Sequence, residues 1–385
     1  MRMRKATSAL VGLLLAGVAA TPAHAQTIRE RQWHLDAMKA DDIWQISTGK
    51  GVTVAVIDTG VGRVSELEGQ VLPGRNLAPS QDGDERIDYD NHGTSIAAMI
   101  AGTGKHPSGD GVIGLAPGVK ILPIRVPIEH DATHPGVTQA IRYAADSDAK
   151  IINISLGLDA EDPSRPDAVA YALSKGKLIF AGVGNDAKGL NNLKYPAATP
   201  GVVGVGAIGP DGGVTEESEH GPQVDMSAPG IDIYTACGGG SEVCVTHGTS
   251  AASALASASA ALLWSAHPDW TNNQVLRVLL NTAGKPVDGA GRNDYVGYGV
   301  VRPRVAVPTP GDPGPADVYP LPDLAAAAAP GGKTAETGAS KPVPLPEASV
   351  KKSDGSSLPW IALGLGACVV IGGAVTAVAV RRNRR

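Results

Sequence analysis

Five short apolar segments limit the folds that this chain can adopt. They are Gly51–Asp58, Lys120–Val126, Lys150–Leu156, Lys177–Gly184 and Gly201–Ile208. Each is rich in β-branched residues and has no polar face, which is typical of strands covered on both sides, as in a parallel sheet.

Segments with helical patterns lie between and after these strands. They are Gly93–Gly102, Gly136–Ser147, Pro166–Lys175, Ala251–Ala266 and Thr271–Thr282, and the last begins with the capping signal "TNNQ". Alternating strands and helices predict an α/β fold: a doubly wound, mostly parallel sheet with helices on both faces. Functional residues of such sheets gather at the carboxyl ends of the strands.

The N-terminus resembles an export signal. Residues 1–25 combine the basic start "MRMRK", the apolar run "SALVGLLLAGVAA" and the small-residue motif "AHA". The alternative, a buried N-terminal helix, is disfavoured because the apolar run has no polar face. We expect cleavage after Ala25, followed by an extension over residues 26–50 that packs on a large domain over residues 51–301.

The C-terminus resembles a membrane anchor. Residues 359–380 include an uncharged stretch that reaches about 30 Å as a helix, enough to cross a bilayer. The basic tail over 381–385 predicts a cytoplasmic end, which places the large domain on the extracytoplasmic side of the cell membrane. Residues 302–358 are rich in Pro, Ala and Gly and are predicted to be a disordered linker.

Charge and cysteine content narrow the class further. A net charge of −5 with no long basic block before the final residues argues against a nucleic-acid partner. Cys237 and Cys244 flank "GGGSEV" on the predicted extracytoplasmic side, so a disulfide is favoured over the alternative of two free thiols. No Cys or His cluster completes a metal site, and we expect neither a metal nor a cofactor.

Four polar residues follow or open these buried elements. Asp58 ends the first strand, His92 and Ser250 precede apolar helices, and Asn185 follows a later strand. Each has a purely structural alternative: Asp58, His92 and Ser250 as helix caps, and Asn185 as part of an Asn-Asp turn. Together they are the residue types of acyl transfer, which needs a nucleophile, a base, a carboxylate and an oxyanion donor.

Six motifs in register resemble the subtilisin-like serine proteases, the subtilases. They are "AVIDTGV", "NHGTSIAAMIAG", "SLG", "GVGN", "VDMSAPG" and "HGTSAA". The predicted export signal, short extension, Pro-rich linker and single anchor are similar to those of the mycosins. These are the membrane-anchored subtilases associated with type VII secretion in actinobacteria.

The resemblance assigns a role to each matching residue. It implies a triad of Asp58, His92 and Ser250, and an oxyanion hole formed by Asn185 and the Ser250 backbone N–H. It implies that two segments bind an extended peptide substrate: Ser155, Leu156 and Gly157, and Gly182, Val183 and Gly184. Of the two "HGTS" copies, the first then supplies the base and the second the nucleophile. Ser95 and His247 are interpreted as bystanders.

Two departures from the family pattern keep other functions open. Ala254 stands where the family has Pro, and only about 26 residues separate the predicted cleavage site from the strand at Gly51, too few for a pro-domain. The leading hypothesis is an active, membrane-anchored serine endopeptidase that works with the type VII secretion machinery. The alternatives are a structural component of the secretion complex with weak or dispensable catalysis and, less favoured, a surface adhesin.

Overall fold

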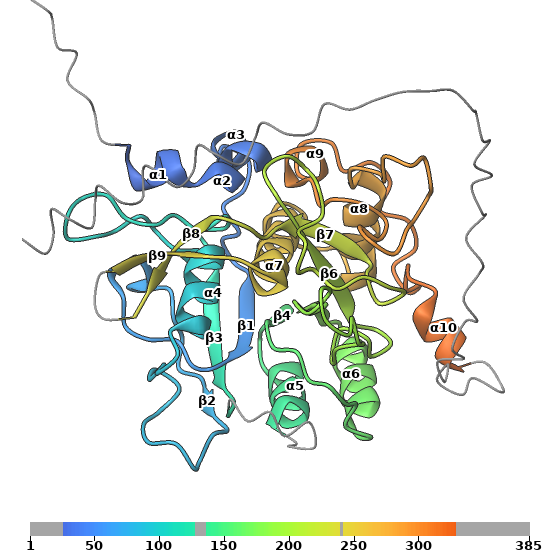
Figure 1. The fold of residues 1–385 in the computed structure, drawn as a ribbon, viewed down its shortest axis with the longest axis horizontal. Helices are drawn as coiled ribbons and strands as arrows, with labels where there is room; N and C mark the ends of the chain where they lie inside the picture. The colour runs from blue at the N-terminus through green and yellow to red at the C-terminus, as the bar shows by residue number, and fades with distance from the viewer. Residues whose placement is uncertain (1–25, 128–135, 239–241, 329–385) are drawn as a thin grey trace, which may run out of the picture. The chain divides into compact units, whose positions relative to one another are not determined.

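The computed structural model describes residues 26–127, 136–238 and 242–328 (Figure 1). The predicted signal peptide, transmembrane helix and basic tail, and the linker from residue 329 onward, lie outside these ranges. Across the described ranges, no helix combines the length and the apolar character that a bilayer crossing requires.

A parallel sheet of seven strands forms the framework of the described chain and confirms the predicted α/β class. Its strands are β1 (Thr53–Asp58), β2 (Arg75–Asn76), β3 (Lys120–Arg125), β4 (Ile151–Ile154), β5 (Leu178–Gly182), β6 (Val203–Ile208) and β7 (Met226–Pro229). Their order is β2-β3-β1-β4-β5-β6-β7. The chain passes from β3 on one side of β1 to β4 on the other, so the order reverses at β1 and β4, where such sheets carry their sites.

Helices cover both faces of the sheet (Figure 1). One face packs on α4 (His92–Ala101), α7 (Thr249–Ala266) and α8 (Asn272–Thr282), and the other on α5 (Gly136–Asp146) and α6 (Arg165–Ser174). Strand side chains alternate between the two cores: Val54 and Val56 face the first, and Ala55 and Ile57 the second. The expected capping box at Thr271 is present, with Gln274 as its partner.

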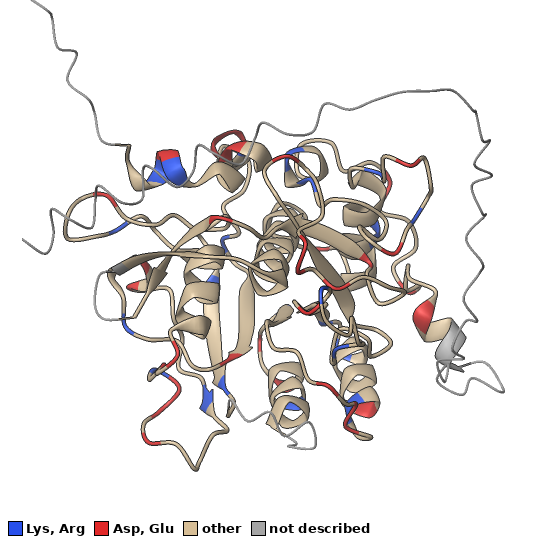
Figure 2. Ribbon diagram, viewed as in Figure 1, with Lys and Arg blue, Asp and Glu red and all other residues tan. Residues whose placement is uncertain are grey.

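Charged residues are kept away from the middle of the sheet. Figure 2 shows that most acidic and basic residues lie in loops and at helix ends. Strands β4 to β7 and helix α7 contain none. All of α7 between Ala251 and Trp264 is buried, so small and apolar side chains let it lie against five strands at once.

The N-terminal extension forms three short helices, α1 (Ile28–Arg31), α2 (Trp33–Met38) and α3 (Ala40–Trp44). Leu35 and Ile43 are buried in the first core. The indole N–H groups of Trp33 and Trp44 donate to the carbonyls of Ile231 and Leu115 at 3.0 and 2.9 Å. Apolar burial and two side-chain hydrogen bonds thus attach the extension to the body.

An antiparallel hairpin of β8 (Ile233–Cys237) and β9 (Glu242–Thr246) lies beside α4. A disulfide joins Cys237 to Cys244, which confirms the predicted pairing. Neither hairpin strand was predicted from sequence. The segment lacks the continuous apolar pattern of the buried strands, because only one of its faces packs on the body.

The predicted linker over residues 302–358 is wrong in its first part. Residues 302–328 belong to the folded body and include the short helices α9 (Pro303–Ala306) and α10 (Asp323–Ala328). Low hydrophobicity suggested disorder here, because composition alone does not show that the body supplies partners for this segment.

Those partners are the guanidinium of Arg277 on α8 and the apolar residues of the first core. The Arg277 guanidinium donates to the carbonyls of Pro313 and Pro315, both at 2.8 Å. Val307 and Leu321 are each 3% exposed and pack into the first core. A few buried side chains and the half-buried donor Arg277 therefore order a segment whose average composition is that of a linker.

We expect a chain over residues 26–301 to be less stable than one over residues 26–328. Fully burying a Val or Leu side chain stabilises a fold by about 1.5–3 kcal/mol, so losing Val307 and Leu321 removes at least about 3 kcal/mol. Urea unfolding of both chains measures this difference. Leu321→Ala in the longer chain should also destabilise it, whereas Val318→Ala, at a side chain 51% exposed, should not. Equal unfolding free energies for the two chains would contradict the assignment of this segment to the body.

Candidate active site

The end of β1 and the start of α4 bring Asp58 and His92 together. The Nδ1 atom of His92 lies 2.7 Å from Oδ1 of Asp58, which also accepts the Thr59 backbone N–H at 2.8 Å. Asp58 is fully buried, while the His92 side chain is 29% exposed. In this geometry Nδ1 carries the proton and donates it to the carboxylate. The Nε2 lone pair is then left to act as a base.

A glycine is required between His92 and the rest of α4. A Cβ atom on Gly93 would lie 2.1 Å from the carbonyl oxygen of Gly60 and 2.9 Å from Cβ of Asp58. No side chain fits in that space. The glycine of the first "HGTS" copy therefore lets the helix approach the strand end closely enough for the Asp58–His92 contact.

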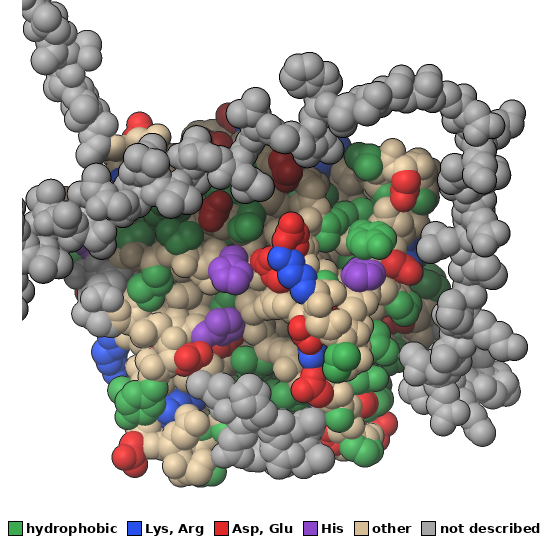
Figure 3. Space-filling view, viewed as in Figure 1, with side chains coloured by type: hydrophobic (Ala, Val, Ile, Leu, Met, Phe, Trp, Pro, Cys, Tyr) green, Lys and Arg blue, Asp and Glu red, His purple; other side chains and the backbone are tan. Residues whose placement is uncertain are grey.

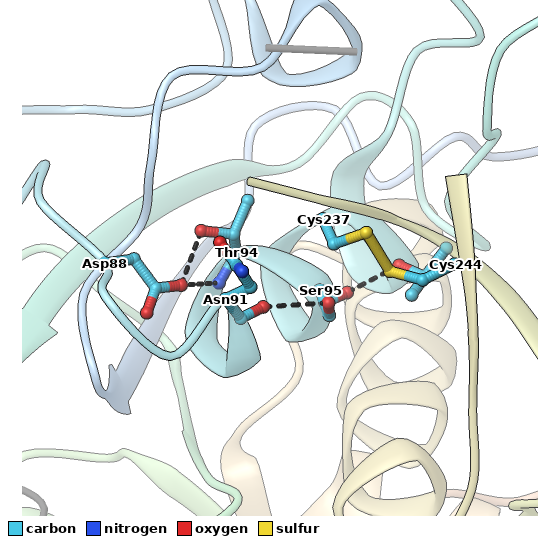
Figure 4. The surroundings of a disulfide bond; sticks show 7 residues. Asp88, Asn91, Thr94, Ser95, Cys237 and Cys244 are labelled. Carbon is cyan, nitrogen blue, oxygen red and sulfur yellow. Dashed lines mark hydrogen bonds between the residues drawn. A yellow bond between two sulfur atoms is a disulfide. The ribbon is translucent and has the colours of Figure 1, made fainter. Parts of the chain in front are cut away.

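A carboxylate that sequence reasoning did not single out secures the contact between Asp58 and His92, and Figure 4 shows this residue, Asp88, beside Thr94. Asp88 accepts the backbone N–H and the hydroxyl of Thr94 at 2.8 and 2.5 Å, and the hydroxyl of Thr59 at 2.7 Å. The Thr59 oxygen in turn accepts the Gly93 N–H at 3.0 Å. Asp88 thus ties the first turn of α4 to the end of β1. An acidic residue just before a helix start was the available sequence signal.

The other polar residue of the first "HGTS" copy has a structural role. The Ser95 hydroxyl donates to the Asn91 carbonyl at 2.8 Å (Figure 4). Its own carbonyl accepts the hydroxyl of Thr235 on β8 at 2.8 Å, which links α4 to the disulfide-bonded hairpin. Ser95 is therefore committed to helix contacts.

The surroundings of His92 favour its charged form. Burial alone would lower the pKa of His92, but the charge and hydrogen bond of Asp58 oppose it, and Asp90 and Asp88 add to their effect. The net result raises the pKa of His92 to about 9. The imidazolium that forms when this base takes a proton is stabilised by the same carboxylates.

Ser250 lies in the first turn of α7 and is half-buried. Its hydroxyl donates to the carbonyl of Ser155 at 3.0 Å, and within the described part of the chain it has no hydrogen bond to His92. Its backbone N–H lies at a helix start, where N–H groups lack intrahelical acceptors. The hydroxyl therefore has to rotate about the Cα–Cβ bond to reach an imidazole.

Buried hydroxyls hold the backbone beneath Ser250. The Ser155 hydroxyl donates to the Ser250 carbonyl at 3.1 Å and lies 3.0 Å from that of Ser253. Asn153, on β4, donates to the Ser155 oxygen and accepts from Ser257. This network fixes the start of α7 to the end of β4. It does so without the proline that the family has at the position of Ala254.

Asn185 lies three residues after β5 and is exposed. Its Oδ1 atom accepts the Thr249 backbone N–H at 2.8 Å, which fixes the orientation of the amide. Its Nδ2 group is left as a donor with no acceptor among the described residues. Together with the Ser250 N–H, it forms a pair of unused donors where α7 begins, suited to a developing negative charge.

A cavity of about 150 Å³ lies against Ser250. Its lining contains most of the predicted substrate-binding residues: Ser155, Leu156, Gly157, Gly182, Gly184, Asn185, Lys194, Thr249 and Ser250. Val183 is the exception to the prediction, because its side chain is buried in the second core and does not line this cavity. Lys194 was not predicted, since a single lysine in a loop carries no sequence signal.

The other ionisable groups on the face shown in Figure 3 add no residue to the candidate site. Figure 3 shows histidine side chains near the middle of one face, beside acidic and basic groups. The side chain of His247 is 73% exposed and lies 3.4 Å from Glu217, in keeping with its interpretation as a bystander. Among the described residues, no group of three or more His, Cys, Asp or Glu side chains is placed to hold a metal ion.

Comparison with known proteins finds bacterial serine proteases among the relatives of this chain. Thermophilic serine proteinase of Bacillus sp. (strain AK1) is 34% identical over 271 residues, which cover 69% of this chain and 64% of that protein. Intracellular serine protease of Paenibacillus polymyxa is 33% identical over 56% of this chain and 67% of its own length. The chain thus spans about two thirds of the length of these relatives.

Solved structures include two similar proteins from type VII secretion systems. MycP1 of the ESX-1 system is 28% identical with a TM-score of 0.65, over 77% of this chain and 91% of that one. MycP3 of the ESX-3 system is 31% identical with a TM-score of 0.63, over 71% and 87%. The model of the subtilase family, Peptidase_S8, matches residues 49–299. The chain therefore belongs to the subtilase family of serine proteases, with mycosins among its structural neighbours.

Proposed function

We propose that this protein is a serine endopeptidase in which Asp58, His92 and Ser250 form the catalytic triad. The observation that carries the proposal is the buried 2.7 Å contact between Asp58 and His92, next to a helix start that presents a serine and two unused donors. Family membership supports the same reaction class.

The reaction begins when the Ser250 hydroxyl turns from the Ser155 carbonyl to Nε2 of His92. As the oxygen attacks the scissile carbonyl, its proton passes to His92, and Asp58 stabilises the imidazolium. Asn185 Nδ2 and the Ser250 N–H bind the oxyanion. His92 then protonates the leaving amine, and water hydrolyses the acyl-enzyme by the same steps in reverse.

The substrate is an extended peptide held by backbone on both sides of the cavity. The segments over residues 155–157 and 182–184 lie at the ends of β4 and β5 and border the cavity, and Leu156 and Gly157 reach the surface, where an added strand could pair with them. Gly157 has no side chain to obstruct that approach. The endopeptidase needs neither a metal nor a cofactor for these steps.

We further propose that the enzyme is anchored in the cell membrane by residues 359–380 and acts outside the cytoplasm with a type VII secretion system. The uncharged C-terminal stretch with its basic tail supports the anchor. The disulfide agrees with an oxidising compartment. The similarity to MycP1 and MycP3 supports the partner.

Ser250→Ala should abolish labelling of the purified protein by a fluorophosphonate probe, because the probe bonds to an activated serine oxygen and releases fluoride. Ser95→Ala is the matched control and should label as the unaltered protein does. Equal labelling of the Ser250→Ala protein would exclude Ser250 as the nucleophile.

The same variant separates the enzyme from the structural alternative. Ser250→Ala in a strain that lacks the protein should fail to restore secretion if catalysis is the function. Full restoration by a stably produced variant would favour a structural component of the secretion complex.

Asn185→Ala and Asn185→Asp should each lower kcat by about 10²–10³, because both remove the Nδ2 donor to the oxyanion. Asn185→Asp keeps an acceptor for the Thr249 N–H. A lower kcat in this variant therefore reports the missing Nδ2 donor and not a change in local structure. Steady-state kinetics on a peptide substrate measures the effect. Unchanged kcat in both variants would show that Asn185 lies outside the oxyanion site.

The value of kcat/KM should rise with pH through a midpoint near 9, because only neutral His92 can accept the Ser250 proton and its pKa is raised to about 9. Asp90→Asn should move the midpoint to lower pH, since it removes a negative charge that raises this pKa. A pH–rate profile of both proteins measures the shift. A midpoint at or below 6.5 in the unaltered protein would contradict the electrostatic account.

A further inference from the structure

A cavity of about 280 Å³ lies between the N-terminal extension and the C-terminal part of the body. Its apolar lining comes from α2, from the ends of β6 and β7 and from the segment before α9, and includes Trp33, Met38, Ile208, Pro229 and Val301. None of its lining residues also lines the cavity beside Ser250. The proposed mechanism therefore uses no part of this cavity.

The charged residues in the lining of this cavity are all basic. They are Lys285, Arg302 and Arg304. Within the described ranges, none of the three forms an ion pair. The side chains of Lys285 and Arg304 are exposed, and that of Arg302 is half-buried. Positive charge around an apolar cavity without carboxylates favours an anionic ligand.

Carboxylates that adjoin the lining along the chain do not neutralise this charge. Each has another partner: Asp36 pairs with Arg29, Asp211 accepts the Gly213 N–H, and Asp288 accepts the Asn293 amide. The distances are 2.9, 2.9 and 2.7 Å. The positive charge of the cavity is therefore left for a group from outside the described chain.

Backbone carbonyls hold the three cations on two sides of the cavity. Lys285 and Arg302 donate to carbonyls in the last turn of α8, at 3.0 and 2.8 Å. Arg304 donates to the Ala37 carbonyl on α2 at 3.0 Å. Each side chain keeps N–H groups that have no acceptor among the described residues. The donors are thus fixed in place and still available to a ligand.

The ligand has to match an apolar floor and cations on two sides. A single phosphate or carboxylate reaches only one side, whereas a peptide in which acidic residues flank apolar ones reaches both. A volume of 280 Å³ is near the lower limit of ligand pockets, about 300 Å³, and suits a few side chains. The chain's own residues 329–358 match poorly, because they carry four lysines against three acidic residues.

We propose that this cavity is a docking site for an acidic segment of a partner protein. An apolar side chain of that segment enters between α2 and the ends of β6 and β7, and its carboxylates pair with Lys285, Arg302 and Arg304. Charges at the rim of such an interface steer association and fix the orientation of the partner. The site does not depend on catalysis at Ser250, so it can be tested separately from the proposed function.

Binding of a fluorescein-labelled peptide, Glu-Glu-Phe-Leu-Glu-Glu, to the full chain in a neutral detergent is measured by fluorescence anisotropy. The chain carries Ser250→Ala, so that the peptide is not cleaved. Replacing every Glu of the peptide by Gln, or its Phe and Leu by Ala, should each lower the affinity by about tenfold or more. Added salt should weaken binding of the original peptide. Equal affinity for all three peptides would overturn the proposal.

Charge reversal in the cavity should remove this binding. Lys285→Glu combined with Arg304→Glu should lower the affinity by at least about tenfold, because both cations become repulsive. Lys105→Glu combined with Lys175→Glu changes the net charge equally at exposed residues outside the cavity and should leave the affinity unchanged. Equal loss in both double variants would mean that the peptide responds only to net charge, and the site would be overturned.

Ala37→Phe tests the apolar part of the site without changing charge. Ala37 is exposed and lines the cavity, so the larger side chain should occupy it and lower the affinity by about tenfold. This variant keeps the proposal testable if the charge-reversed chain does not fold. Unchanged affinity in every cavity variant would overturn the proposal.

A soluble anionic lipid, dihexanoylphosphatidylglycerol, serves as the competing class of ligand. The acidic peptide should bind more tightly than this lipid, because one phosphate reaches one side of the cavity only. If the lipid binds, loses affinity on reversal of Lys285 and Arg304, and the peptide does not bind, the cavity is a lipid site and a protein partner is excluded.

Discussion

The contact between helix α7 and the ends of β4 and β5 sets the position of the nucleophile and the oxyanion donors in the proposed site. A Cβ on Gly182 would lie 2.9 Å from the backbone and hydroxyl of Thr249, so the strand end and the helix start touch directly. Ser155 holds the Ser250 carbonyl, and Asn185 holds the Thr249 N–H. Because the nucleophile and the oxyanion donors share this contact, a change in the packing of α7 would move them together.

Two buried carboxylates near this contact are compensated in different ways. Asp58 accepts two hydrogen bonds and faces an imidazole that gains charge during the reaction. Glu219 faces the ammonium of Lys194 at 3.8 Å, and burial raises its pKa. The first arrangement suits a group that must stay ionised while a proton moves nearby. In the second, the carboxylate is compensated less completely, and its neutral form is favoured by burial.

Much of this architecture could be predicted from the sequence, because buried parallel strands have a continuous apolar pattern. Strands β1 and β3 to β6 and helices α4 to α8 lie within a few residues of their predicted ranges. Strand β7 and the hairpin were missed, since they are short or packed on one face only. The order of residues 302–328 was missed because it depends on Arg277 and on apolar surface elsewhere in the body.

The site could be predicted in its residues but not in its surroundings. Asp58, His92, Asn185 and Ser250 stand beside motifs that a sequence displays. Asp88, Lys194 and Glu219 act through contacts with residues distant along the chain, and no local pattern marks them. The orientation of the Ser250 hydroxyl towards Ser155 is likewise a property of the folded structure alone.

The strand order also affects when activity can arise. The three contacts that define the site join residues 34, 64 and 95 positions apart. Folds dominated by such non-local pairings form slowly, because the entropy of closing long loops is lost before the contacts are gained. No part of the chain holds a complete site by itself. A chain that has not folded over its whole length therefore lacks a complete site, which forms only when the whole sheet and α7 have assembled.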